Sequence, residues 1–131
     1  MAMTTVNYAN SKSYTGGTLQ PLAGVTLVGP HKNVLIKGVL VDTGADLLQV
    51  PEAAAIQAGW MTSLGLKIPI GTAGGTTAMI KLAGVSIQIE GVSFVTDMLC
   101  HPDPYSRPLL GRAALAGLIN FGFDPANWLW V

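Results

Sequence analysis

The chain has 131 residues, half of them hydrophobic and only 11% charged, and its seven basic residues balance seven acidic ones. This length suits one domain with a buried core, and the balanced, scattered charges exclude an electrostatic case for a nucleic-acid partner. The single cysteine, Cys100, excludes an intrachain disulfide and a cysteine-based zinc cage, and we expect no metal or other cofactor.

The first residues are polar and contain no apolar core segment, so they do not form a signal peptide. We expect residues 1–18 to be a flexible leader and residues 19–131 to be the folded domain. No apolar run approaches the roughly 20 residues of a membrane span. These features predict a soluble, intracellular, cytoplasmic protein without a membrane partner.

Short apolar segments separated by glycine and proline predict a mostly β fold. Gly24–Val28 and Val34–Val41 are the first two strands, joined by a turn at residues 29–33. The second strand is almost wholly apolar, which predicts that both of its faces are buried. It ends directly at Asp42.

The rest of the chain continues this pattern, with two short helices. Pro51–Gly59 has proline at its start and glycine at its end, which is typical of a helix, and Arg112–Leu118 is the second. Three hairpins are predicted: 68–70 with 77–80, 85–89 with 92–95, and 118–123 with 128–131. His101–Pro108 is a loop because three of its residues are proline.

Asp42 is the strongest candidate for chemistry, since Thr43 and Gly44 follow it at the end of an apolar strand. A carboxylate near a core is costly unless something pairs with it. Two such carboxylates that meet share a proton, so that one is a base toward water while the other polarises a carbonyl group. In the alternative interpretation, Asp42 and Gly44 are only turn-forming residues.

Three segments together resemble the retropepsins, the retroviral-type aspartic proteases, and in particular their cellular and bacterial branch. Val39–Asp46 resembles the active-site loop, and residues 70–76 (Ile-Gly-Thr-Ala-Gly-Gly-Thr) resemble the glycine-rich flap. Pro108–Arg112 resembles the segment before the C-terminal helix of the family. The resemblance implies a retropepsin-like β-barrel or sandwich with a flap hairpin and one or two short helices.

The resemblance also implies the function and the roles of individual residues. The chain would be an aspartic endopeptidase, active as a homodimer on an extended peptide or protein substrate, with Asp42 of each chain as the catalytic carboxylate. Thr43, Gly44 and Ala45 would support the active-site loop, and Asp46 would pair with Arg112. Substrate contacts would come from Asp46 and from the flap residues Thr72, Ala73, Gly74 and Gly75.

Some alternatives stay open at the level of the sequence. The chain could be a non-catalytic retropepsin-like dimerisation or peptide-binding module, or one part of a longer precursor. The terminal residues 128–131 (Trp-Leu-Trp-Val) fit either core packing or an exposed dimer interface. Apolar side-chain pockets are expected around the cleft.

Other polar residues are weaker candidates. Loop positions are expected for Asp97, Asp103 and Asp124, and surface positions for His31 and His101. Gly71–Gly75 is not expected to bind phosphate, because no lysine and no helix follow it in the required register.

Overall fold

The computed structural model of the chain describes residues 6–72 and 74–131, and its fold is mostly β, as the sequence predicts. Ala73, which belongs to the predicted flap, and the first five residues of the predicted leader lie outside the described residues. The elements are β1 (Asn10–Ser13), β2 (Leu22–Val28), β3 (Asn33–Val41), β4 (Leu48–Pro51), α1 (Glu52–Ala58), the short 3₁₀ helix η1 (Thr62–Leu64), β5 (Leu66–Thr72), β6 (Gly75–Ile89), β7 (Val92–His101), β8 (Leu109–Leu110), α2 (Arg112–Leu115), β9 (Phe121–Phe123) and β10 (Asn127–Trp130).

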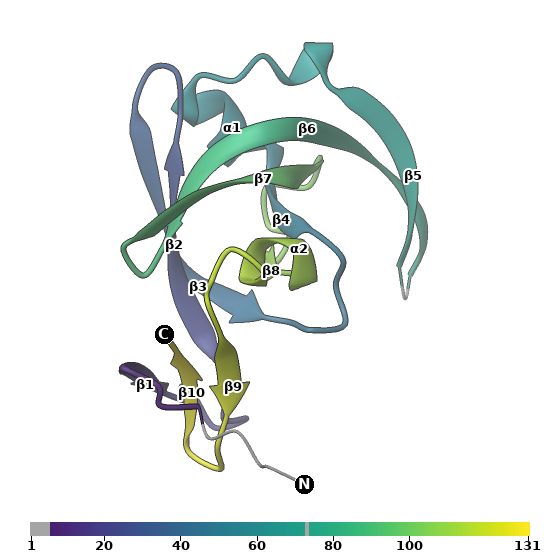
Figure 1. The fold of residues 1–131 in the computed structure, drawn as a ribbon. Helices are drawn as coiled ribbons and strands as arrows, with labels where there is room; N and C mark the ends of the chain where they lie inside the picture. Colours follow the sequence, from purple (N-terminus) through teal and green to yellow (C-terminus); the bar gives the residue numbers. More distant parts are fainter. Residues whose placement is uncertain (1–5, 73) are drawn as a thin grey trace, which may run out of the picture.

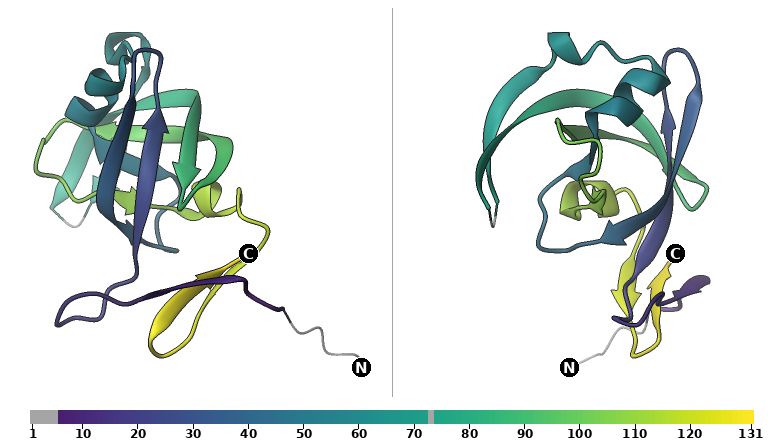
Figure 2. Two further views of the ribbon diagram at one scale, coloured as in Figure 1. Left: turned by 90° about the vertical axis from the view of Figure 1, so that its left-hand side faces the viewer. Right: turned by 180° about the vertical axis from the view of Figure 1, so that it is seen from behind.

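The main sheet has seven strands in the order β2-β3-β8-β4-β7-β6-β5. β2 also pairs with β6, so the strands from β2 to β6 in this order form a closed circuit, and β5 extends it at one side. Most neighbours are antiparallel, whereas β3–β8 and β4–β7 are parallel. Figures 1 and 2 show the long, curved β6 passing over β7, β4 and β8.

The core lies inside this circuit and follows the two-residue alternation of strands. On β2, the side chains of Ala23, Val25 and Leu27 are fully buried, and the positions between them are only partly covered. β4, β7 and β8 contribute buried residues in the same way: Leu48, Val50, Met98, Cys100 and Leu110. Truncating one of the fully buried leucines to alanine is expected to cost about 2–5 kcal/mol of stability.

β3 differs from its prediction as a strand buried on both faces. Only Val39 and Val41 are buried, and Leu35 in its first half is 56% exposed. The reason is pairing: the first half pairs with β2 alone, and β8 joins only at Leu40 and Val41. Figure 1 shows the β2–β3 hairpin projecting beyond the rest of the sheet. An apolar sequence without a second neighbouring strand therefore stays partly in solvent.

The predicted helices are both present, one of them shorter than expected. α1 follows Pro51 and ends at Gly59, whose φ of 106° is the left-handed conformation that favours glycine. α2 ends at Leu115, before the predicted end at Leu118. A side chain at Gly117 would overlap the ring of Phe94, so the glycine lets the chain after α2 pass close to β7.

The C-terminal hairpin β9–β10 forms a second, three-stranded sheet with β1. Trp128 is fully buried, its indole N–H donates to the carbonyl of Leu22 at 3.1 Å, and its ring stacks on Trp130 at 4.1 Å between centroids. Because Trp130 is only 6% exposed, both tryptophans are core residues. The sequence left open whether the terminal tryptophans pack in the core or form an exposed dimer interface. The structure supports core packing, so the interpretation as an exposed interface is wrong.

The N-terminal segment also differs from the expectation that order begins near Leu19. Asn10–Ser13 pairs with β10 in the register Asn10 with Trp130. Lys12 adds an ion pair of 2.8 Å with Glu90, whose carboxylate also accepts from the backbone N–H of Gly24 at 2.9 Å. The sequence of β1 is polar, but a sheet edge binds a strand through backbone groups, so polarity did not prevent pairing.

Candidate active site

Asp42 lies immediately after β3, where the backbone fixes it from both sides. Its own N–H donates to the carbonyl of Leu110 at 3.0 Å, and one carboxylate oxygen accepts from the N–H of Gly44 at 2.9 Å. The N–H of Ala45 donates to the Asp42 carbonyl at 3.2 Å, which closes a tight turn. These bonds fix the loop and orient the carboxylate.

The segment of Gly111 and Arg112 packs against this loop and binds its backbone. The backbone N–H of Arg112 donates to the carbonyl of Ala45, and that of Ala113 donates to the carbonyl of Asp46, both at 2.9 Å. A side chain at Gly111 would overlap the backbone of Leu47 and would lie 2.8 Å from the carbonyl oxygen of Ala45. Glycine is therefore required for this close approach.

The Arg112 side chain connects two parts of the loop. It forms an ion pair with the carboxylate of Asp46, and its Nη1 donates to the carbonyl of Thr43 at 2.6 Å. The pair that the family resemblance implies is thus present in the structure. Its side chains are 55% and 82% exposed, so in a single chain it contributes only about 0–1 kcal/mol.

The loop from Asp42 to Asp46 is more open than a core position. Asp42 is half-buried, and Thr43 and Gly44 are exposed. The single chain therefore presents the carboxylate at a surface, where a second molecule can reach it.

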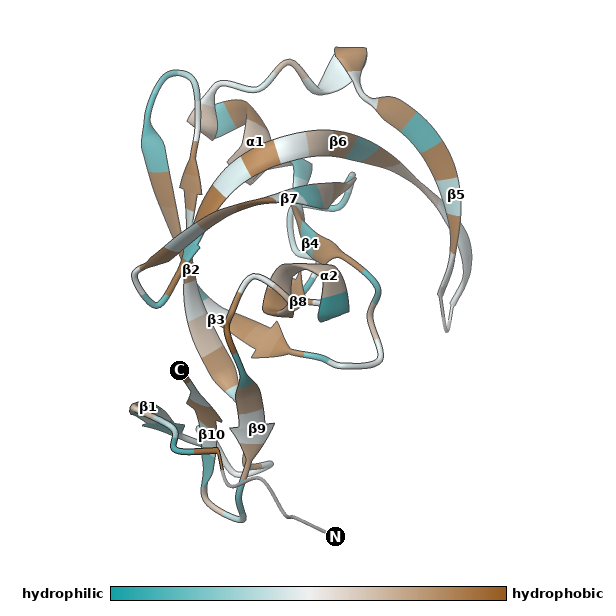
Figure 3. Ribbon diagram, in the orientation of Figure 1, coloured by the Kyte–Doolittle hydropathy of each residue, from teal (hydrophilic) through white to brown (hydrophobic). Residues whose placement is uncertain are grey.

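The hairpin of β5 and β6 faces this loop across a pocket of about 550 Å³. Ile70 and Gly71 of the hairpin and Gly44, Ala45 and Asp46 of the loop all line the pocket. Figure 3 shows hydrophobic and more polar residues alternating along β5, which ends in the hairpin. Thr72 and Gly75 pair at the hairpin tip. Of the other predicted site residues that the structure describes, Gly74, Gly75 and Asp42 are not among the lining residues.

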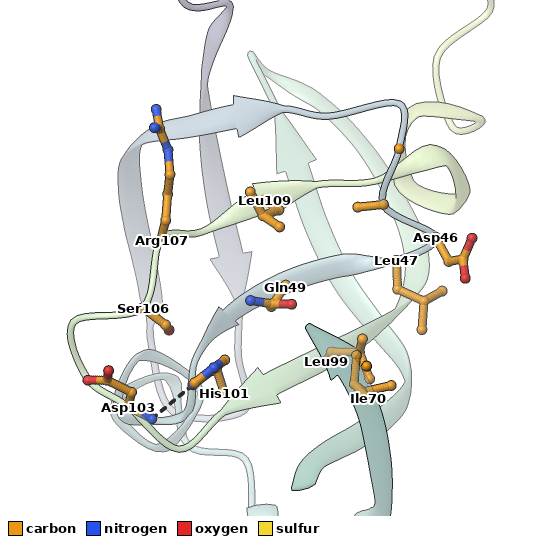
Figure 4. Close-up of a pocket in the computed structure, with 13 residues that line it drawn as sticks. Asp46, Leu47, Gln49, Ile70, Leu99, His101, Asp103, Ser106, Arg107 and Leu109 are labelled. Carbon is orange, nitrogen blue, oxygen red and sulfur yellow. Dashed lines mark hydrogen bonds between the residues drawn. The ribbon is translucent and has the colours of Figure 1, made fainter. Parts of the chain in front are cut away.

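Most of the pocket comes from residues to which the sequence analysis gave no role in the site. β4 and the residue before it, β7, β8 and the loop before β8 supply eight lining residues, all labelled in Figure 4: Leu47, Gln49, Leu99, His101, Asp103, Ser106, Arg107 and Leu109. The signal in the sequence was alternation alone, since every second residue of these short strands faces the pocket.

Two of the weaker candidates differ from their expected positions. Asp97 lies on β7 rather than in a loop, and it pairs with Lys81 at 3.6 Å. His101 is the half-buried last residue of β7 and lines the pocket, so it is not simply a surface residue. Its Nδ1 accepts from the backbone N–H of Asp103 at 3.0 Å, which in the neutral ring leaves the proton on Nε2.

Asp124, in contrast, lies in the β9–β10 turn. Backbone N–H groups of Ala126 and Asn127 donate to its carboxylate and lower its pKa. This carboxylate closes a hairpin and lies far along the chain from the loop.

Cys100 does not offer a nucleophile. Burial, and then the nearby negative charge of Glu52, raise the pKa of its thiol to about 12. In residues 6–72 and 74–131 there is no group of three or more His, Cys, Asp or Glu side chains that could hold a metal ion. Within the same ranges, no helix has the length and apolar character needed to cross a bilayer.

Comparison with known proteins adds no relative to this picture. No protein-family model and no curated protein matches the chain.

Proposed function

We propose that the chain is a retropepsin-like aspartic endopeptidase that is active as a homodimer. One observation carries the proposal: an Asp-Thr-Gly loop, with its carboxylate oriented by the Gly44 N–H, lies beside a pocket that a β-hairpin borders from the opposite side. The low proportion of charged residues also favours a partner that covers part of the surface.

A second copy supplies what one chain lacks. The chain contains one Asp-Thr-Gly sequence, and the neighbouring acid Asp46 is already paired with Arg112. A two-fold axis close to the exposed Thr43 and Gly44 would bring two Asp42 carboxylates together. They would then hold one shared proton, because two ionised carboxylates in contact repel each other.

The reaction follows from this arrangement. The ionised Asp42 takes a proton from a water molecule, whose oxygen attacks the carbonyl carbon of the peptide bond. The protonated Asp42 of the other copy gives its proton to the carbonyl oxygen, and a tetrahedral diol forms. When the C–N bond breaks, the leaving nitrogen takes the proton that the first Asp42 carboxylate holds. A hydroxyl group of the diol then returns a proton to the Asp42 carboxylate of the other copy.

An extended peptide is the substrate that fits best. It would lie between the loop and the β5–β6 hairpin, where backbone hydrogen bonds hold it and closure of the hairpin excludes water. Side chains of the peptide would enter the pocket beside Gly44.

Replacement of Asp42 tests the proposal. Asp42→Asn keeps the shape of the side chain and removes the base, so peptide cleavage between pH 4 and 7 should fall by on the order of a thousandfold or more. Asp97→Asn is the matched control, because it removes the same charge from β7, and it should keep wild-type cleavage. A statine-type transition-state mimic should inhibit the wild-type protein.

Two results would contradict the proposal. Equal cleavage by Asp42→Asn and wild-type protein would exclude Asp42 as the catalytic residue. A folded wild-type protein that binds peptides and cleaves none would support the peptide-binding module instead.

A further inference from the structure

The pocket beside the Asp42 loop contains one polar side chain, Gln49, between two leucines. Gln49 of β4 is paired in register with Leu109 on one side and with Leu99 on the other. All three side chains line the pocket, and Figure 4 shows the Gln49 amide between Leu109 and the end of β7. The neighbours Leu48 and Val50 point the other way and are fully buried.

The backbone of Gln49 holds β4 between β7 and β8, and its side chain takes no part in this pairing. Its side chain makes no hydrogen bond within the part of the chain that the structure describes, and its two leucine neighbours could pack equally well against an apolar residue. An amide in such a position keeps both a donor and an acceptor directed at the pocket.

Two further polar groups lie at the same end of the pocket. The Ser106 hydroxyl is buried and, within residues 6–72 and 74–131, has no hydrogen-bond partner. His101 is two residues beyond Leu99 on β7 and therefore on the same face, and its Nε2–H remains available because Nδ1 already accepts from Asp103. Buried polar groups are normally hydrogen-bonded, so unpaired groups in a pocket indicate a missing partner.

Each charged residue of the pocket has a partner within the chain. Asp46 pairs with Arg112, the Asp103 carboxylate accepts from the backbone N–H of Tyr105 at 2.9 Å, and Arg107 donates to the Gln20 amide at 2.6 Å. Gln49, Ser106 and the His101 Nε2–H are uncharged, and together they supply both donors and acceptors.

We propose that this pocket selects a carboxamide side chain, glutamine or asparagine, of the bound peptide, and that Gln49 determines the selection. Two carboxamides form a reciprocal pair, in which each N–H donates to the other carbonyl oxygen. A carboxylate offers no donor to the Gln49 oxygen, and an ammonium group offers no acceptor to its nitrogen. An aliphatic side chain would displace water from the Gln49 amide without replacing its hydrogen bonds.

This proposal rests on the proposed function for the identity of the ligand as an extended peptide, and it adds one selective polar group to the apolar pockets expected from the sequence. A position-scanning peptide library bound to the Asp42→Asn protein tests it without cleavage. One peptide position should show glutamine and asparagine enriched about tenfold or more over leucine, glutamate and lysine.

Variants of Gln49 give the decisive comparison. Gln49→Leu should transfer the preference at that position to leucine, and the isosteric Gln49→Glu, which cannot donate, should reduce the enrichment of glutamine. Gln57→Leu, on the exposed face of α1, is the control and should keep the parent profile.

The outcomes separate the two proposals. Carboxamide selection by the Asp42→Asn protein, combined with no cleavage by the wild-type protein, would refute the peptidase and leave the pocket inference standing. Absence of carboxamide enrichment, absence of any peptide binding, or an unchanged profile in both Gln49 variants would overturn the pocket inference, even if the wild-type protein cleaves peptides.

Discussion

Arg112 Nη1 donates to the carbonyl oxygen of Thr43 at 2.6 Å, which links α2 to the loop that carries Asp42. The same guanidinium pairs with Asp46, so one planar group holds two points of the loop. Both side chains of the ion pair are more than half exposed in the single chain. The ion pair therefore contributes more to the geometry of the loop than to the stability of the chain.

Arg112→Lys should separate these two effects. Lysine keeps the charge but lacks the planar guanidinium group that binds both Thr43 and Asp46. Peptide cleavage should therefore fall about tenfold or more, whereas the free energy of unfolding should change by less than about 1 kcal/mol. Cleavage kinetics and urea unfolding measure the two quantities. Asp97→Asn, which weakens the partly exposed pair with Lys81, is the control and should change neither quantity appreciably. If Arg112→Lys cleaves peptides as fast as the wild-type protein, the role assigned to the guanidinium group is contradicted.

Gly111→Ala should disturb the loop through its backbone. The added methyl group would overlap Leu47 and crowd the carbonyl of Ala45, so we expect a loss of about 1–3 kcal/mol of stability together with a loss of cleavage. Gly17→Ala is the control, because nothing lies within 4 Å of its added methyl group. Thermal unfolding of the two variants gives the comparison, and equal melting temperatures would show that the loop does not depend on this close approach.

Deletion of residues 1–13 should weaken the terminal sheet. It removes β1 and the Lys12–Glu90 ion pair, and it exposes the edge of β10. We expect the free energy of unfolding to fall by about 1–3 kcal/mol. Urea unfolding of the shortened chain measures the change. An undiminished stability would mean that the segment is a leader without a structural role, as its polar sequence suggested.

Cys100 should make the protein sensitive to alkaline pH. Its thiol pKa is raised from 9.0 to about 12 in the fold, so the folded state keeps the proton where the unfolded state loses it. The resulting stability is complete below pH 9.0 and declines as the pH rises toward about 12. Unfolding of wild-type and Cys100→Ala proteins should show a smaller alkaline loss for the variant. An equal loss in both proteins would exclude Cys100 as its source.

Local patterns in the sequence were sufficient for much of the fold. Proline before α1 and glycine after it, the alternation at Val85–Ile89, and the turn at Glu90 and Gly91 each act within a few residues. The loop after β3 was recognisable in the same way, because Asp42, Thr43 and Gly44 are consecutive.

The pocket could not be predicted by these means. Leu99, Gln49 and Leu109 come from three different strands, and only the pairing register places them in one row. The sequence likewise did not reveal which half of β3 has a second neighbour, or that a polar segment would pair with β10. Each of these features depends on tertiary pairing between distant segments, which outweighs local polarity.

The central claim is that two chains share one active site, and mixing active with inactive chains tests it most directly. Wild-type and Asp42→Asn proteins are mixed in equal amounts, allowed to exchange subunits, and assayed at a fixed amount of wild-type chain. Because random pairing leaves about half of the wild-type chains with an inactive partner, cleavage should fall to about half of that of wild-type protein alone. Undiminished cleavage, after subunit exchange has been demonstrated, would show that each chain works independently and would contradict the shared Asp42 pair.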